Sequence, residues 1–323
     1  MNRRFMLGAA LGAASSPLAA PALRAQTFDH AIRFIIPNAP GGTSDILARL
    51  MGPELTRTLG QNVVIENRTG AGGNIGGDFV AKSPPDGHTV LLMDVTTLAT
   101  NPALFPRLSY KTSDLAPVSM VIYAPYILGV ANNLPVRDAA GLVAHAKAHP
   151  NTLNAANSGT GTASHLTAVM LEDAWGTPIT HVPYRGGAPA LLAVSTGEAS
   201  MTLAGATQSL PFAMNGQMRA VAVTGPSRFA TLPQVPTFRE LGWPGVDAGT
   251  WQGALVAAGT PAVLINRLHA AMRDALAQPQ LAARIAELGA TPRTDGPDAF
   301  ASWLAEQTEA YTKLIRDHDI RSD

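Results

Sequence analysis

Apolar runs and stretches of helical periodicity alternate along the first third of the chain. Runs typical of buried strands lie at residues 32–37, 63–66 and 89–93. Between the first two runs, residues 44–59 carry apolar side chains at helical spacing, and Thr43 or Ser44 is expected to cap that helix. A shorter helical face follows over residues 75–80. This order of strands and helices predicts a parallel, doubly wound sheet.

The same alternation returns in the middle of the chain. Residues 118–131 are expected to form two strands around Pro125, and strands and helices then alternate up to residue 223. A strand over residues 249–259 precedes a mostly helical end. The chain therefore contains two α/β units, and the last helices must pack against one of them.

The N-terminal segment has the pattern of an export signal. Arg3 and Arg4 precede an apolar stretch over residues 5–14, which is too short to span a membrane. Small residues follow, and we expect cleavage after Ala25, with Ala22 as the alternative. The paired arginines fit twin-arginine export or general secretion equally well. We expect a periplasmic protein.

Composition excludes several classes of function. The chain has 23 Lys+Arg and 23 Asp+Glu, so no basic surplus indicates a nucleic-acid partner. It has no cysteine, which excludes disulfides, thiolate catalysis and cysteine-based metal centres. Two α/β units in an exported, cysteine-free chain predict a periplasmic-binding-protein-like clamshell, with two doubly wound lobes joined by a two-crossover hinge. The expected lobes are residues 27–124 plus 250–323 and residues 125–249.

A glycine-rich stretch, GAGGNIGG, begins at Gly70 and precedes a helical pattern. From Gly72 its glycines have the spacing of a phosphate-binding loop, but Asp78 stands where the lysine belongs. Ile75 replaces the third glycine of a dinucleotide fingerprint. Nucleotide binding is therefore not expected. The glycines serve close backbone packing, or their amides form part of the wall of a ligand cleft.

The segment ENRTGAGGNIGGDFVAKSPPDGHTVLL closely resembles a signature of the Bug (TctC-like) family, the solute receptors of tripartite tricarboxylate transporters. PNAPGGTSDILAR, NSGTGTASHLTAVML, HVPYRGGAPALLAVSTGE and WQGALVAAGTP follow in the family's order and spacing. The resemblance covers nearly the whole mature chain. It implies a two-lobed periplasmic binding protein, a small carboxylate ligand and membrane permease subunits as partners.

Two loops have the layout of an anion site. Ala39–Asp45 and Asn157–His165 each join the end of a strand to the start of a helix, where free N–H groups and the helix dipole attract a carboxylate. A ligand held between the two loops would draw the lobes together. Asp45 has a second interpretation, as a first-turn acid that stabilises its own helix, and Thr43 has one as a helix cap.

Other strand ends complete the expected cleft. Arg185 follows such an end, but a solvated role is favoured for it, so recognition is expected through dipoles, hydroxyls and water. We expect these ligand-binding residues: Ala39, Gly41, Gly42, Thr43, Asp45, Thr96, Thr97, Ser158, Gly159, Thr162, His165, Tyr184, Gly205 and Ala206.

Two other functions stay open beside transport. The same closed form would serve a receptor that presents its ligand to a two-component sensor. An exported hydrolase is disfavoured, since ANSGTG has Ala156 where a nucleophile elbow needs glycine. His145 and His149 share a helix face but lack a nearby acid, so no metal site is expected. We expect a monomer without cofactor or catalytic activity, and the identity of the ligand stays open.

Overall fold

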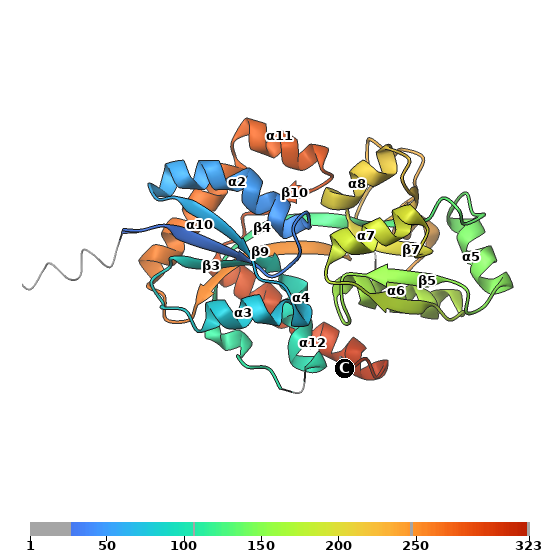
Figure 1. The fold of residues 1–323 in the computed structure, drawn as a ribbon, viewed down its shortest axis with the longest axis horizontal. Coiled ribbons are helices and arrows are strands. Elements are labelled where there is room, and N and C mark those ends of the chain that lie inside the picture. Colours follow the sequence, from blue (N-terminus) through green and yellow to red (C-terminus); the bar gives the residue numbers. More distant parts are fainter. Residues whose placement is uncertain (1–26, 106, 246–247, 322–323) are drawn as a thin grey trace, which may run out of the picture.

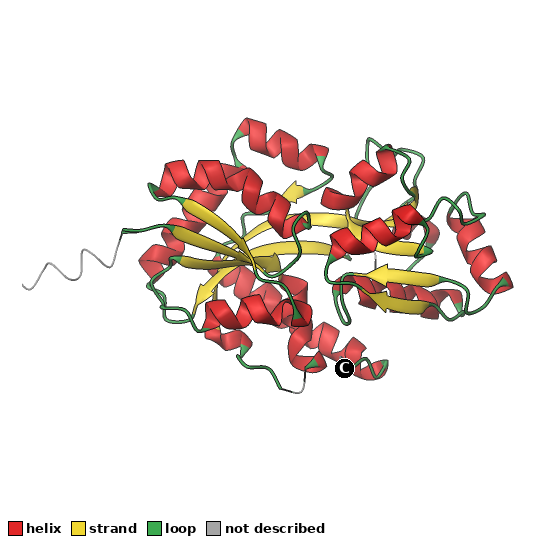
Figure 2. Ribbon diagram, in the orientation of Figure 1, coloured by secondary structure: helices red, strands yellow, loops and turns green. Residues whose placement is uncertain are grey.

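The computed structural model describes residues 27–105, 107–245 and 248–321, and the predicted signal peptide lies outside these residues. The described strands form one continuous sheet in the order β2-β1-β3-β9-β4-β7-β5-β6, with β8 and β10 also paired to β4. Figure 1 shows two groups of strands and helices side by side, with β4 and β9 running between them. Helices cover both faces of each group (Figure 2).

The first group contains the parallel strands predicted from the N-terminal apolar runs. We call its strands, with residues 115–125 of β4, the first half-sheet. Its strands are β1 (Ile32–Ile36), β2 (Val63–Asn67), β3 (Thr89–Asp94), β9 (Gly249–Ala257) and β10 (Thr291–Pro292). Its helices are α2 (Thr43–Leu59), α3 (Asn74–Ala81), α4 (Val95–Leu104), α10 (Ala262–Leu276), α11 (Pro279–Glu287) and α12 (Pro297–Asp317), with 3-10 turns η1 (Ala71–Gly73) and η2 (Thr112–Asp114).

The second group repeats the arrangement. We call its strands, with residues 126–130 of β4, the second half-sheet. Its strands are β5 (Asn154–Asn157), β6 (Thr180–Pro183), β7 (Met201–Gly205) and β8 (Arg219–Val223). Its helices are α5 (Ala139–Ala148), α6 (Ala163–Trp175), α7 (Gly187–Thr196), α8 (Ala206–Met214) and α9 (Phe238–Leu241). The strands β5, β6 and β7 are parallel to one another, as the alternating pattern predicted.

One strand, β4 (Leu115–Val130), belongs to both half-sheets. It pairs with β9 as far as Pro125 opposite Gly249, and with β7 from Tyr126 opposite Gly205. The prediction of two separate strands around Pro125 is therefore wrong. Proline is tolerated in a strand where its missing N–H is not needed by a neighbour, and Pro125 stands where β4 changes its partner. The division of the chain into two lobes stays a prediction.

The C-terminal helices pack on the first half-sheet and reach the second. Helix α10 packs on α2, whereas α12 packs on α4 and β4. Near its end, Ile315 of α12 is buried with Leu104 of α4 and Leu166 of α6. The two groups are thus in contact through α4, α6 and α12. No helix in the described part of the chain has the length and apolarity needed to cross a membrane.

Candidate functional site

A cavity of about 400 Å³ lies between the two half-sheets, and we call it the central cavity. It opens at the carboxyl ends of β1, β2, β3, β5 and β6, because each of these strands runs directly into a loop or helix that lines it. From the first group it is lined by Pro37, Asn38, residues 69–73, Ile75 and Thr97. From the second group it is lined by Ser158, Gly159, Thr162, Tyr184, Arg185 and Gly186. Five predicted residues therefore meet in one cavity: Thr97, Ser158, Gly159, Thr162 and Tyr184.

Three helices begin at the wall of the central cavity. The N-caps of α3, α6 and α7 are Gly73, Thr162 and Gly186, and all three residues line the cavity. None of the three makes a side-chain capping hydrogen bond. The first N–H groups of a helix have no acceptor within the helix, and the helix dipole makes that end positive. Three such ends from both groups give the cavity the character of an anion site.

The glycine-rich stretch contributes one of these ends. Gly70, Gly72 and Gly73 have positive φ angles of 127°, 60° and 89°, which other residues rarely adopt. Gly76 lies so close to Pro37 that a Cβ atom there would approach the Pro37 Cβ to 2.9 Å. The glycines therefore serve backbone packing and also bring this loop to the cavity wall. Sequence analysis left both interpretations open but did not include the loop among the binding residues.

The loop between β5 and α6 is held by its own hydrogen bonds. The Gly159 N–H donates to Asn157 Oδ1 (3.0 Å), and the Thr162 hydroxyl donates to the Gly159 carbonyl (2.8 Å). The Gly161 N–H donates to His165 Nδ1 (2.9 Å). Burial and the neighbouring His181 lower the pKa of His165 to about 4, so its ring is a neutral acceptor at pH 7. His165 thus positions the loop and does not line the central cavity; it borders a separate cavity of about 330 Å³.

The backbone amides of the loop between β1 and α2 are bonded within the loop and are less available to a ligand than expected. The Gly41 N–H donates to Asp45 Oδ2 (3.0 Å), and the Gly42 N–H donates to the Ala39 carbonyl (3.3 Å). Gly42 is the N-cap of α2, so the prediction of Thr43 or Ser44 as the cap is wrong. Both glycine amides are already bonded within the loop, and the parts of this segment that line the central cavity are Pro37 and Asn38.

Asp45 is a buried acid at the centre of this loop. It accepts hydrogen bonds from the Gly41 N–H, from Arg49 Nε and Nη2 (3.0 Å each) and from the Asn67 amide (3.2 Å). Burial raises the pKa of Asp45, but the Arg49 guanidinium and the Gly41 and Asn67 N–H groups outweigh it and hold the pKa below its ordinary value. The interpretation as a helix-stabilising acid therefore agrees with its contacts.

The remaining predicted residues lie around the central cavity without lining it. Ala39 faces Gly186 of the opposite group, since a Cβ on Gly186 would lie 3.7 Å from the Ala39 nitrogen. Gly41 lines a second cavity between the groups, of about 360 Å³. Gly205 is buried between Thr43 and Thr250. Ala206 is fully buried in the apolar core of the second group and does not line the central cavity.

Three buried polar groups occupy equivalent places after parallel strands. Among the buried side-chain atoms of the described residues that have no protein hydrogen-bond partner are Thr43 Oγ1, Asn157 Nδ2 and Thr207 Oγ1. They follow β1, β5 and β7, respectively. Buried polar atoms in proteins almost always have a partner, from the protein, from water or from a ligand. Their grouping at the strand ends marks the region between the half-sheets as the place where polar partners are needed.

The charge of the central cavity is set by Arg185. Of the described residues that line it, none is acidic, and Arg185 is the one with a charged side chain. Arg185 is exposed and forms no ion pair within the described part of the chain. Tyr184 lies beside it, and its hydroxyl donates to Glu198 Oε1 (2.8 Å). Sequence analysis did not place Arg185, Asn38 or Gly186 in the site, although each follows a predicted strand end.

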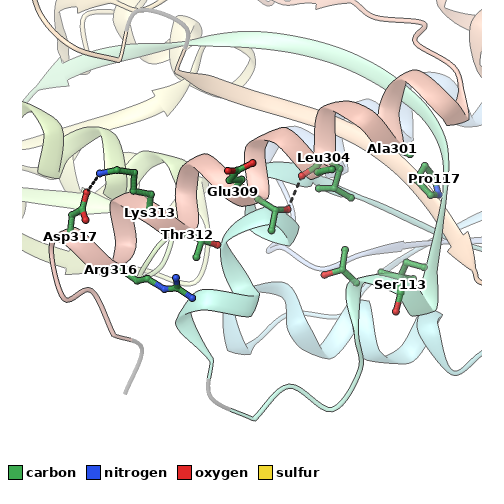
Figure 3. A pocket seen from close by; sticks show the side chains of 13 residues that line it. Ser113, Pro117, Ala301, Leu304, Glu309, Thr312, Lys313, Arg316 and Asp317 are labelled. Carbon is green, nitrogen blue, oxygen red and sulfur yellow. Dashed lines mark hydrogen bonds and ion pairs between the residues drawn. The ribbon is translucent and has the colours of Figure 1, made fainter.

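A larger cavity, of about 890 Å³, lies between α12 and the segment over residues 112–117 (Figure 3). Leu304 and Ala301 lie along its apolar part, and Lys313 is paired with Asp317 at one end. Its lining carries charges of both signs, and Lys313 is paired with Asp317. The central cavity is therefore the better candidate site.

Comparisons with known proteins agree with this choice. Residues 47–320 match the family model described as "Tripartite tricarboxylate transporter family receptor". The solved periplasmic binding protein BugD is 30% identical, with a TM-score of 0.86 over 91% of this chain and 100% of that chain. MatC from Rhodopseudomonas palustris, solved with bound malate, is 31% identical, with a TM-score of 0.82 over 88% and 99% of the two chains.

A further solved structure, a protein of R. palustris with adipate, is 30% identical, with a TM-score of 0.86 over 91% of this chain and 99% of that chain. These matches confirm the predicted periplasmic-binding-protein-like α/β fold and the resemblance read from the sequence motifs.

Proposed function

This chain belongs to the receptor family of tripartite tricarboxylate transporters, and we propose that it captures a small carboxylate in the central cavity and delivers it to membrane permease subunits. The observation that carries the proposal is the meeting of three helix N-termini, those of α3, α6 and α7, at a cavity whose described lining has no acidic side chain. Such ends stabilise a negative charge through backbone N–H groups.

The proposed ligand has its carboxylate among these N-termini. The unpartnered Asn157 amide lies at the end of β5 and is available to the ligand or to waters around it. The exposed Arg185 guanidinium adds attraction at the cavity wall. Malate and adipate, which are bound by two relatives, are the first candidates.

Delivery requires that the ligand-bound form differ from the free form. The cavity wall comes from both half-sheets, and β4 belongs to both of them. A ligand that contacts both groups stabilises the arrangement in which they are close. We propose that this closed arrangement, in the periplasm after removal of the signal peptide near Ala25, is the form the permease recognises.

The test uses acid and amide pairs of the same shape. The mature protein is unfolded, freed of small molecules, refolded and titrated with adipate, adipamide, malate and malamide by isothermal titration calorimetry. We expect at least one acid to bind and its neutral amide to bind at least about tenfold more weakly, a difference of about 1.4 kcal/mol. Equal binding of an acid and its amide, or no binding of any acid by well-folded protein, would overturn the carboxylate proposal.

The transporter role is tested in the producing organism. Deletion of the gene should abolish uptake of the radiolabelled acid identified by calorimetry, and deletion of the cognate permease subunits should have the same effect. Uptake that persists without this protein, combined with loss of a transcriptional response to the acid, would favour the sensor alternative instead.

A further inference from the structure

Two histidines and an aspartate lie together at the end of the first half-sheet that is opposite to the central cavity. Asp29 and His30 precede β1, and His88 precedes β3. The two strands are parallel neighbours, and the Arg33 N–H donates to the His88 carbonyl (2.7 Å). The amino ends of β1 and β3 therefore bring together residues that are 59 positions apart in the chain.

The spacing of their polar atoms suits a metal ion. One ligand atom from each residue lies within 4.8 Å of the others, and among the described residues this is the one such group of three. Asp29 Oδ1 is 3.5 Å from His88 Nε2 and 2.7 Å from His30 Nδ1. Tetrahedral zinc holds its nitrogen and oxygen ligands about 3.4 Å apart. The first distance already matches, and the second is a hydrogen bond whose proton an ion would replace.

His88 is arranged to present Nε2. Its Nδ1 lies 3.1 Å from the Asp86 carbonyl and 3.4 Å from Asp86 Oδ1, so we assign the ring proton to Nδ1. The lone pair of Nε2 then faces Asp29 and accepts a hydrogen bond from its backbone N–H (3.3 Å), which a bound ion would replace. A carboxylate or carbonyl behind the second nitrogen is the usual support of a metal-binding histidine.

Packing fixes this ring while leaving the other two ligands adaptable. The His88 side chain is 7% exposed, and Phe28 packs edge-on against it. His30 stacks on His88 with ring centroids 3.6 Å apart. The side chains of His30 and Asp29 are 62% and 72% exposed, so both can turn toward an ion without disturbing the core.

We propose that Asp29, His30 and His88 bind one divalent transition-metal ion of the zinc type, with water completing its coordination. Two imidazoles and one carboxylate favour Zn²⁺, Ni²⁺ or Cu²⁺ over Mg²⁺ and Ca²⁺, which prefer oxygen ligands. The ion would tie the segment before β1 to the turn before β3, and binding to the folded form would stabilise it. The site is independent of the carboxylate ligand, since it lies at the other end of the strands.

The test is a titration of ZnCl2 into the mature chain prepared without a histidine tag. We expect one equivalent to bind by calorimetry, and a rise in the thermal midpoint that MgCl2 does not reproduce. His30→Ala and Asp29→Asn should each lower zinc affinity at least about tenfold, because a three-ligand site becomes a two-ligand site. Both side chains are exposed, so the variants should fold like the parent protein.

The matched control is the double variant His145→Ala/His149→Ala. These histidines lie one turn apart on α5, with ring centroids 4.5 Å apart, and could bind zinc as a pair. We expect the control to keep its zinc affinity. Absence of zinc binding to the parent chain, unchanged affinity in His30→Ala, or loss of binding in the control would each overturn the proposal.

Discussion

Gly161, in the loop before α6, lies directly against Leu104 at the end of α4. A Cβ atom on Gly161 would lie 1.9 Å from Leu104 Cδ1 and 2.6 Å from Cδ2. Leu104 is itself 2% exposed and packed with Leu166 and Ile315, so it has little room to move aside. Because Gly161 has no side chain, the loop before α6 in the second group can lie directly against α4 of the first group.

We predict that Gly161→Ala weakens carboxylate binding. Leu104 and the new methyl group cannot occupy the same space, so the two groups must separate near the central cavity. Contacts made by a ligand with both groups would then be lost in part. We expect calorimetry to give an affinity lower by at least about tenfold, or about 1.4 kcal/mol.

Gly176 is the matched control for this variant. It caps the other end of α6 with φ 63°, close to the φ of 72° at Gly161, and a Cβ there would meet nothing within 4 Å. Alanine at either position has a backbone cost of about 1 kcal/mol. Gly176→Ala should therefore carry the same backbone cost without the clash, and should keep its ligand affinity. Equal affinities of the two variants would contradict the importance of the Gly161–Leu104 contact.

Asn157→Asp is predicted to weaken anion binding while leaving the loop intact. Asn157 Oδ1 accepts the Gly159 N–H, a bond that a carboxylate oxygen can also accept. The exchange replaces the unpartnered Nδ2 by an oxygen and adds negative charge beside the cavity. We expect at least about tenfold weaker binding of the acid, because two like charges in a partly buried site repel. Asn133→Asp, the same exchange at an exposed position, should leave affinity unchanged, and equal effects would exclude a local role for Asn157.

Arg185→Gln should have a smaller, salt-dependent effect. The guanidinium is exposed, so its attraction for an anion is screened by water and salt. We expect roughly a three- to fivefold loss of affinity at low ionic strength, which is no more than about 1 kcal/mol, and a smaller loss at 0.5 M NaCl. Arg137→Gln, at another exposed arginine outside the cavity lining, should change affinity little at either salt concentration. A loss independent of salt would indicate a packing role.

The ends of the strands could be predicted from the sequence because βαβ order fixes which loops lie at the carboxyl edge. Thr97, Ser158 and Tyr184 were found in this way. Helix α4 was missed, since its threonines and Pro102 do not resemble a helical pattern. Its place in the fold depends on burial against α12, which is a tertiary contact.

The contacts of the loops could not be predicted in the same way. The Gly41 N–H appeared available for a ligand, but the side chain of Asp45 returns to accept it. The approach of the glycine-rich stretch and Gly186 to one cavity depends on how the two half-sheets are oriented, which local sequence does not encode. The pairing of Asp29 with His88 likewise appears only when β1 and β3 are neighbours.

We predict that the stability of the protein depends on pH through Asp94, the last residue of β3. Asp94 caps α4 by accepting the Thr96 N–H (3.0 Å), and burial raises its pKa from 3.8 to about 6. The folded state therefore binds this proton more tightly than the unfolded state. Its free energy of unfolding should fall as pH rises from about 4 to about 6, and should then stay level with respect to this group. The full shift corresponds to roughly 1–3 kcal/mol after allowance for the partial exposure of the residue.

Asp94→Asn should remove this dependence while keeping the cap, because asparagine caps helices as well as aspartate does. Urea unfolding of both proteins from pH 4 to 7.5 measures the difference, in which the contributions of all other groups cancel. We expect the variant to gain stability relative to the parent as pH rises from about 4 to about 6, with no further gain above that. Asp138→Asn repeats the exchange at an exposed cap, where Asp138 accepts the Gly141 N–H, and should give nearly parallel curves. Parallel curves for Asp94→Asn as well would show that burial does not hold a proton on Asp94.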